Sequence, residues 1–223
     1  MNSILETVCL ICNNIRNITK QGISFQKLLT VVRREFNNNN LQIKFKSSRK
    51  SFLGEEEFYV NAYYDCEDDE DGDSCIEVII YHNFDKNVIW DQKHITDLLI
   101  QIFDAVVHEF KHQRQARQRN YKTYWARHDG RHHYHLYLTD PDEIDAYAFS
   151  IAIELCRTLG KFRALRYLPR FTKLSRLKIH GHFVSPNFNA YACHFEIDDP
   201  ILQSLVKKVY TRLMKLDTDF IFM

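Results

Sequence analysis

The sequence predicts an α+β protein, in which a small and mainly antiparallel sheet is combined with several helices. Apolar residues recur at helical spacing in residues 1–18, 25–36 and 95–119. Between the second and third of these segments, short stretches alternate apolar and polar residues, as strands do. No Gly or Pro interrupts residues 95–119, so this segment is expected to form one long helix.

Length and composition favour one folded domain, with 223 residues of which 45% are hydrophobic. We expect three consecutive parts within this domain. They are an N-terminal helical pair (1–40), a sheet with the helices of a candidate site (41–155) and a C-terminal helical part (156–223). The net charge of +1 predicts no general attraction to nucleic acid or to a membrane.

Segments that would carry the chain into a membrane are not expected. No apolar run reaches 18 residues, and the first residues carry Glu6 and no basic residue before Arg16. The six cysteines are scattered and are interpreted as reduced thiols. Cys9 and Cys12 are expected to be buried small hydrophobes rather than a redox or metal pair. The predicted location is therefore the cytoplasm.

Two helices are expected to open the chain. Gly22 ends the first, Ser24 stands where it could cap the second, and four consecutive asparagines at 37–40 end the second. Their apolar faces favour a packing layer over the sheet, and a docking module is the less favoured alternative.

The central part should contain strands and an acidic loop. Strands are expected at residues 41–45, 58–64, 76–81 and, as a short fourth strand, 88–90. The acidic loop, 65–73, carries seven carboxylates and could bind calcium. Because its spacing does not match an EF-hand loop, a solvated hairpin loop is the favoured interpretation.

Within the long helical segment, His108-Glu109-Phe110-Lys111-His112 has the form H-E-x-x-H. Side chains at positions i and i+4 of a helix lie on one face, so both imidazoles can point at one metal ion. Glu109 follows about 100° round the same turn and can reach water held on that ion. Two nitrogen ligands and a carboxylate placed to take a proton are the components of a zinc-hydrolase motif.

An ordinary solvated helix face is the alternative interpretation of this motif. Any amphipathic helix carries a polar stripe. The stripe of this helix consists of Asp97, Gln101, Asp104, His108 and His112. A third ligand, on a separate rigid element, is what distinguishes a zinc site from such a stripe.

Glu143 is the candidate third ligand. A new helix is expected to begin after Asp140, a good N-cap residue, with Pro141 in its first position and Glu143 in its first turn. A Glu three residues after the N-cap also fits a capping box, which needs no metal. A capping box does not need paired histidines on another helix, so the H-E-x-x-H segment favours the metal-ligand interpretation.

The order of a sheet, an H-E-x-x-H helix, a basic connection and a helix opening with Glu143-x-x-Ala146 resembles the gluzincin metallopeptidases. Residues 143–149 are most similar to the E-x-x-A helix of the ImmA/IrrE-type peptidases, and the resemblance covers roughly residues 41–155. It implies a zincin-like fold with an active-site helix and a second, ligand-bearing helix. The Asn-, Lys-, Ile- and Phe-rich composition resembles that of tailed-phage proteins, which would place the protein in a host cytoplasm.

The same resemblance implies a site and a mechanism. His108, His112 and Glu143 would hold Zn²⁺, which lowers the pKa of a bound water, and Glu109 would take the proton of that water. The nucleophile would attack a carbonyl of a peptide or protein substrate, and Glu109 would pass the proton to the leaving amine. Candidates for stabilising the transition state are His180, His182, Tyr191 and His194.

The C-terminal part is expected to contain a basic helix at 161–176, an irregular crossing loop at 180–191 and an amphipathic helix at 201–216. A histidine-rich loop precedes the Glu143 helix, and any one of its histidines could be a further ligand. These histidines are His128, His132, His133 and His135.

Two basic tracts, 111–131 and 157–178, indicate a different function. Seven basic residues interleaved with aromatics in the first, and eight without any acid in the second, could contact nucleic acid. The near-neutral chain favours instead that the tracts balance the acidic loop. A nucleic-acid-binding protein, or a structural phage protein on a zincin-like fold without turnover, therefore remains the alternative to a zinc metallopeptidase.

Overall fold

The computed structural model describes residues 2–41, 43–73, 75–85, 88–122 and 134–222. Its mixed helices and small sheets confirm the predicted α+β class. The chain divides into two compact units: Met1–Lys122 with Phe222–Met223 form unit 1, and Thr123–Ile221 form unit 2. The boundary near residue 122 falls inside the predicted central part, and the organisation of the whole chain as a single domain stays a prediction.

The N-terminal helices of unit 1 form where they are expected, as α1 (Asn2–Ile18) and α2 (Phe25–Asn38). Gly22 between them has a φ of +80°, and a Cβ there would lie 3.0 Å from the carbonyl oxygen of Trp90, so only glycine fits the turn. Ser24 occupies the N-cap position of α2, but its side chain makes no capping hydrogen bond to a described residue. Cys9 and Cys12 are buried on α1, as predicted, and none of the six cysteines forms a disulfide with a described residue.

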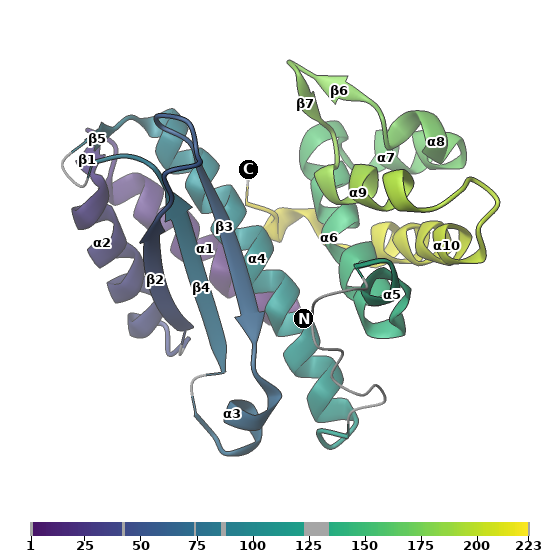
Figure 1. Cartoon of the computed structure of the whole chain (residues 1–223), viewed down its shortest axis with the longest axis horizontal. Helices are drawn as coiled ribbons and strands as arrows, with labels where there is room; N and C mark the ends of the chain where they lie inside the picture. The colour runs from purple at the N-terminus through teal and green to yellow at the C-terminus, as the bar shows by residue number, and fades with distance from the viewer. Residues whose placement is uncertain (1, 42, 74, 86–87, 123–133, 223) are drawn as a thin grey trace. The chain divides into compact units, whose positions relative to one another are not determined.

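The main sheet of unit 1 has the order β2 (Ile43–Arg49), β4 (Ile76–His82), β3 (Phe58–Tyr64). Its strands lie side by side in front of α1 (Figure 1). The central strand β4 alternates strictly between buried and half-buried residues, which gives the sheet one face toward the helices. The pairing of β3 with β4 is antiparallel, but that of β2 with β4 is parallel. The predicted fourth strand forms as β5 (Ile89–Trp90) and pairs with β1 (Ile23–Ser24), not with the main sheet.

The acidic segment 65–73 is not the fully solvated hairpin loop that was predicted. It contains a short helix, α3 (Cys66–Glu70), whose N-cap Asp65 accepts hydrogen bonds from the backbone N–H groups of Glu67 and Asp68. Asp69 is buried within it. Three acidic residues lie in the first turn of α3, where the positive end of the helix dipole stabilises their negative charges. This interaction helps so acidic a segment to fold.

The long helix of unit 1 is α4 (Gln92–Gln118), and it begins at Asp91, whose carboxylate accepts from the N–H of His94 at 2.9 Å. Its large apolar residues between Ile95 and Val107 are buried, and the helix packs against α1 and the sheet. Gln101, a member of the predicted polar stripe, accepts a hydrogen bond from the N–H of Val60 at 2.9 Å. This bond fixes α4 to the edge strand β3.

Unit 2 is built around α6 (Pro141–Leu159), which is buried almost continuously from Ile144 to Cys156 and packs against α10 (Pro200–Lys215). The predicted basic helix forms in three pieces because Pro169 opens a 3-10 turn within it. The remaining elements of unit 2 are α5 (Tyr134–Thr139), α7 (Lys161–Tyr167), η1 (Leu168–Arg170), α8 (Phe171–Leu174), β6 (Lys178–Ile179), β7 (His182–Phe183), α9 (Pro186–His194) and η2 (Thr218–Phe220).

The prediction of an irregular loop at residues 180–191 is wrong. Strands β6 and β7 form a hairpin whose turn residues, His180 and Gly181, both have positive φ, as a type I′ turn requires. Helix α9 follows, with Ser185 as N-cap and Pro186 in its first turn. Ser185 and Pro186 are residues that commonly begin a helix. The sequence did not predict this helix because its apolar face is short and buries only Phe188 and Tyr191. No helix in the described ranges is long and apolar enough to cross a membrane.

Candidate metal centre

The paired histidines of the H-E-x-x-H segment face one another on α4. The Nε2 atoms of His108 and His112 lie 3.1 Å apart, and the two rings are inclined at 70°. Two nitrogen ligands on a tetrahedral zinc ion would be separated by about 3.3 Å, given Zn–N bonds of about 2.05 Å. The pair therefore matches the spacing of two zinc ligands without further adjustment of the helix.

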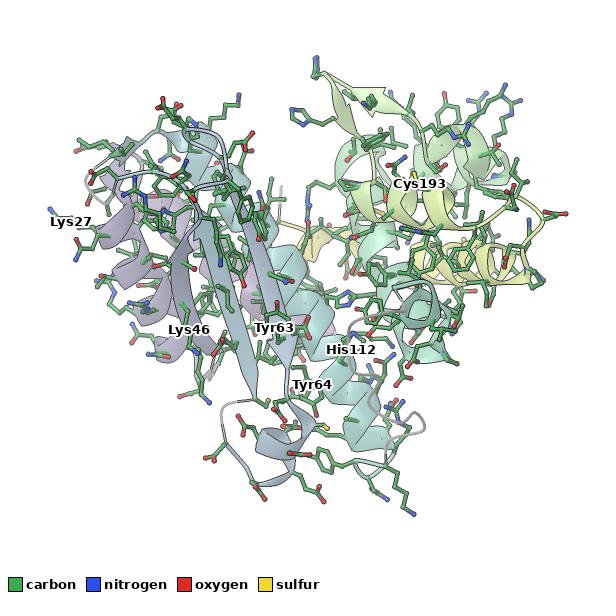
Figure 2. All side chains as sticks on the ribbon, viewed as in Figure 1. Lys27, Lys46, Tyr63, Tyr64, His112 and Cys193 are labelled. Atoms are coloured by element: carbon green, nitrogen blue, oxygen red, sulfur yellow. The ribbon has the colours of Figure 1, made fainter. Side chains whose placement is uncertain are left out.

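Glu109 lies next to this pair on the buried side of α4. It is only 9% exposed, and Lys111 is 8% exposed, whereas His108 and His112 are half-buried (Figure 2 labels His112). The helix thus presents two imidazoles at a surface and keeps the intervening carboxylate away from bulk water.

An ion pair with a buried acid fixes the C-terminal turns of α4, directly after His112. The carboxylate of Asp69 accepts from Arg117 through Nε and Nη2, from Nε2 of Gln113 at 2.8 Å and from the hydroxyl of Tyr64 at 3.0 Å. Gln113 immediately follows the second metal-site histidine. The acidic segment therefore holds the turn of α4 on which that histidine stands.

The environment of Asp69 shifts two pKa values in opposite directions. Burial raises the pKa of Asp69, but its hydrogen bonds from Arg117, Gln113 and Tyr64 outweigh burial and lower the pKa to about 2. Burial, followed by the nearby charge of Asp69, raises the pKa of the Cys75 thiol to about 11. Asp69 is thus ionised, and Cys75 is an unreactive thiol, across the neutral range.

Glu143 lies in the first turn of α6 in unit 2, where the sequence predicts it. Asp140 caps the helix by accepting from the N–H of Asp142 at 2.8 Å. In a capping box, the glutamate would accept a hydrogen bond from the backbone N–H of the N-cap residue. That N–H of Asp140 instead donates to the carbonyl of Tyr137 at 3.1 Å. The carboxylate of Glu143 is hydrogen-bonded to the hydroxyl of Tyr137.

A group of tyrosines surrounds this hydrogen bond. The rings of Tyr137 and Tyr147 meet edge to face at 6.4 Å, and Tyr147 meets Tyr191 at 5.2 Å. Burial of its hydroxyl, and then the charge of Glu143, raise the pKa of Tyr137 far above its usual value. Tyr137 therefore stays protonated and donates to Glu143. The sequence analysis did not identify this tyrosine, although it stands six residues before Glu143.

The other predicted site residues fall into three groups. Tyr191 is fully buried, and its hydroxyl donates to the carbonyl of Leu138 at 3.1 Å. His180, His182 and His194 are exposed, the first two at the β6–β7 hairpin and the third at the end of α9. Of the histidine-rich loop, His128, His132 and His133 lie outside the described residues, and only the backbone of His135 is described, within α5.

The structure brings His108, Glu109 and His112 together on α4 in unit 1, and it places Glu143 beside Tyr137 in unit 2. These groups offer two imidazole nitrogens and one oriented carboxylate, which are ligand types that zinc prefers. No protein-family model, no curated protein and no solved structure matches this chain.

Proposed function

We propose that the chain is a zinc-dependent metallopeptidase of the gluzincin group, with a zincin-like fold similar to that of the ImmA/IrrE-type peptidases. The observation that carries the proposal is the pair of Nε2 atoms, of His108 and His112, held 3.1 Å apart on one face of α4. An amphipathic helix requires a polar face, but it does not require two imidazoles with their nitrogens turned toward each other.

Glu143 is proposed as the third ligand. His108, His112 and Glu143 are side chains that could together hold a metal ion. Sites with three protein ligands are typical of catalytic zinc, whereas structural zinc is usually held by four. The hydrogen bond from Tyr137 supports this role, because carboxylate ligands of metals are themselves commonly hydrogen-bonded.

The chain's own residues then have distinct tasks in peptide hydrolysis. Bound at this centre, zinc would act as a Lewis acid that makes water a stronger acid and polarises a substrate carbonyl. Glu109, buried and one residue from His108, takes a proton from the attacking water and returns it to the leaving amine. His108 and His112 act through Nε2, and Tyr137 keeps Glu143 in place.

Among the candidates for stabilising the transition state, Tyr191 is the least suited. Its hydroxyl hydrogen is committed to the carbonyl of Leu138, and its ring is fully buried. His180, His182 and His194 keep this role as candidates, because all three residues are exposed.

Zinc analysis of protein purified without a histidine tag or added metal tests the proposal. About one zinc per chain is expected, and His112→Ala should lose it. His94→Ala is the matched control, since His94 lies on the same helix but bonds to Asp91. A wild-type protein that neither carries nor takes up zinc would show that the proposal is wrong. The histidine pair would then be an N–H···N hydrogen bond on a solvated helix face.

The third ligand needs its own measurement. Glu143→Ala should weaken zinc binding sharply, which titration against a competing chelator measures. Zinc affinity equal to that of the wild type would remove Glu143 from the ligand set. Zinc binding without peptide hydrolysis against a broad peptide library would favour a structural protein on this fold.

A further inference from the structure

Unit 2 carries a long segment without negative charge. Residues 155–195 contain no Asp or Glu, and eight Lys or Arg residues fall between Arg157 and Lys178. In the structure this segment forms α7, η1, α8, the β6–β7 hairpin and α9. Figure 2 shows side chains with nitrogen at their tips projecting from α7, α8 and the hairpin.

Six of these basic residues form what we call the basic strip. All six are exposed, and none makes an ion pair with any residue that the structure describes. The basic strip consists of Arg163, Arg166, Arg170, Lys173, Arg176 and Lys178. Its charges are thus left for a partner to neutralise.

Other basic residues of the chain, unlike those of the basic strip, form ion pairs or hydrogen bonds with described residues. In unit 1, Lys46 pairs with Glu77 at 2.5 Å and Lys44 with Asp68 at 3.5 Å. Lys161, at the start of α7, donates to the carbonyl of Leu216 at 2.8 Å and so satisfies the end of α10. It has a structural task and does not belong to the strip.

Helix geometry places two arginines of the strip on one face of α7. Arg163 and Arg166 are spaced i and i+3 within this helix, and Arg170 follows at the end of η1. Ala164 and Leu168, on the other face, are buried in unit 2. The face is therefore rigidly supported while its charges remain in solvent.

Two exposed aromatic rings accompany these arginines. Phe162 is 90% exposed and Tyr167 is 43% exposed. Phe162 is four residues before Arg166, and Tyr167 is four residues after Arg163, so each ring shares a helix face with an arginine. An almost fully exposed phenylalanine contributes nothing to the core of unit 2, and its ring is free to stack on a ligand.

We propose that the basic strip, together with Phe162 and Tyr167, binds single-stranded nucleic acid. Arginine forks bind phosphate oxygens in pairs, and exposed rings stack on unpaired bases. An anionic membrane fits less well, because interfacial helices present a continuous apolar face to lipid, whereas the exposed rings of α7, Phe162 and Tyr167, alternate with Arg163 and Arg166. An acidic polypeptide could neutralise the charges but offers no bases to the two rings.

Fluorescence anisotropy with the full chain and a labelled single-stranded oligonucleotide tests this interface. Combined Arg163→Ala, Arg166→Ala and Arg170→Ala should lower affinity at least about tenfold at low salt. Each lost phosphate contact should also reduce the slope of log affinity against log salt by roughly 0.7. Combined Lys20→Ala, Lys27→Ala and Lys207→Ala removes the same charge from exposed sites elsewhere and should have little effect.

Phe162→Ala tests the contribution of base stacking to binding separately from that of charge. It should weaken binding to the single strand roughly tenfold with an unchanged salt slope, and the exposed site leaves folding intact. Wild-type affinity in the triple arginine variant, or no binding by the wild type, would overturn the proposal. Binding only to phosphatidylserine vesicles or to polyglutamate would overturn it in favour of a membrane or an acidic protein. None of these measurements requires zinc, so the outcome is independent of the proposed peptidase.

Discussion

The carboxylate of Asp69 receives a two-pronged hydrogen bond from the guanidinium of Arg117, at 3.0 Å from Nε and 2.6 Å from Nη2. The Asp69 side chain is 3% exposed and that of Arg117 is 55% exposed. The acid is therefore fully removed from water, while the base keeps part of its hydration. Several donors satisfy the buried charge, so removing the carboxylate would leave buried donors without their acceptor.

Replacing Asp69 should therefore destabilise unit 1. Asp69→Asn removes the negative charge that accepts hydrogen bonds from four donor groups. We expect the free energy of unfolding at neutral pH to fall by about 2 to 3 kcal/mol. Asp68→Asn is the control: its pair with Lys44 is exposed and should contribute at most about 0.5 kcal/mol. Urea denaturation measures both. Equal, small losses would show that the pair of Asp69 with Arg117 does not stabilise the fold.

The same ion pair predicts an acid-sensitive stability. The pKa of Asp69 lies at about 2 in the folded chain, below the ordinary value of 3.8. A depressed pKa means that the stabilisation, about 2 kcal/mol, is complete above about pH 4 and is lost as pH falls toward 2. Denaturation of the wild type and Asp69→Asn between pH 2 and 5 should show their difference shrinking at the acid end. A pH-independent difference contradicts the prediction.

Tyr137→Phe should weaken zinc binding if Glu143 is a ligand. The variant keeps the ring but removes the hydroxyl that orients the carboxylate, and loss of such a partner typically costs 10- to 100-fold in metal affinity. Tyr210→Phe, at an exposed position of α10, is the matched control. Competition with a chelator measures both affinities. If the wild type binds zinc and Tyr137→Phe binds it equally well, Tyr137 has no positioning role.

Glu109→Gln should retain zinc and lose peptide hydrolysis. The amide preserves the size of the side chain but cannot take a proton, and loss of a general base typically lowers kcat by about 10²- to 10⁴-fold. Asp97→Asn makes the same chemical change at an exposed position of α4 and should leave activity unchanged. Zinc content and turnover are measured on the same preparations. Wild-type turnover by Glu109→Gln would exclude the proposed mechanism.

Ser185→Ala should destabilise unit 2. The buried hydroxyl of Ser185 donates to Glu154 at 2.5 Å and accepts from the N–H of Phe188 at 3.1 Å, so it caps α9 and satisfies a buried carboxylate. We expect a loss of about 2 kcal/mol. Ser24→Ala tests the same substitution at an N-cap whose side chain makes no capping bond, and its loss should be much smaller. Similar losses in the two variants would contradict this account.

The sequence by itself determined the elements whose evidence is local. Helical spacing of apolar residues located α1, α2, α4, α6 and α10 to within a few residues, and Asp140 with Pro141 marked the start of α6. The facing of His108 and His112 also follows from local geometry, because residues i and i+4 of any helix share a face. Their 3.1 Å separation comes from the structure, because it depends on the rotamers of both imidazoles.

The tertiary structure alone decided the contacts between residues distant in sequence. Asp69 and Arg117 are 48 residues apart, and nothing in the acidic segment distinguishes the one carboxylate that becomes buried from its solvated neighbours. The parallel pairing of β2 with β4 was likewise open, since an alternating pattern fixes the buried face of a strand but not its neighbour. Periodicity reports positions along one element, whereas partners between elements are selected by packing and by the need to satisfy buried charges.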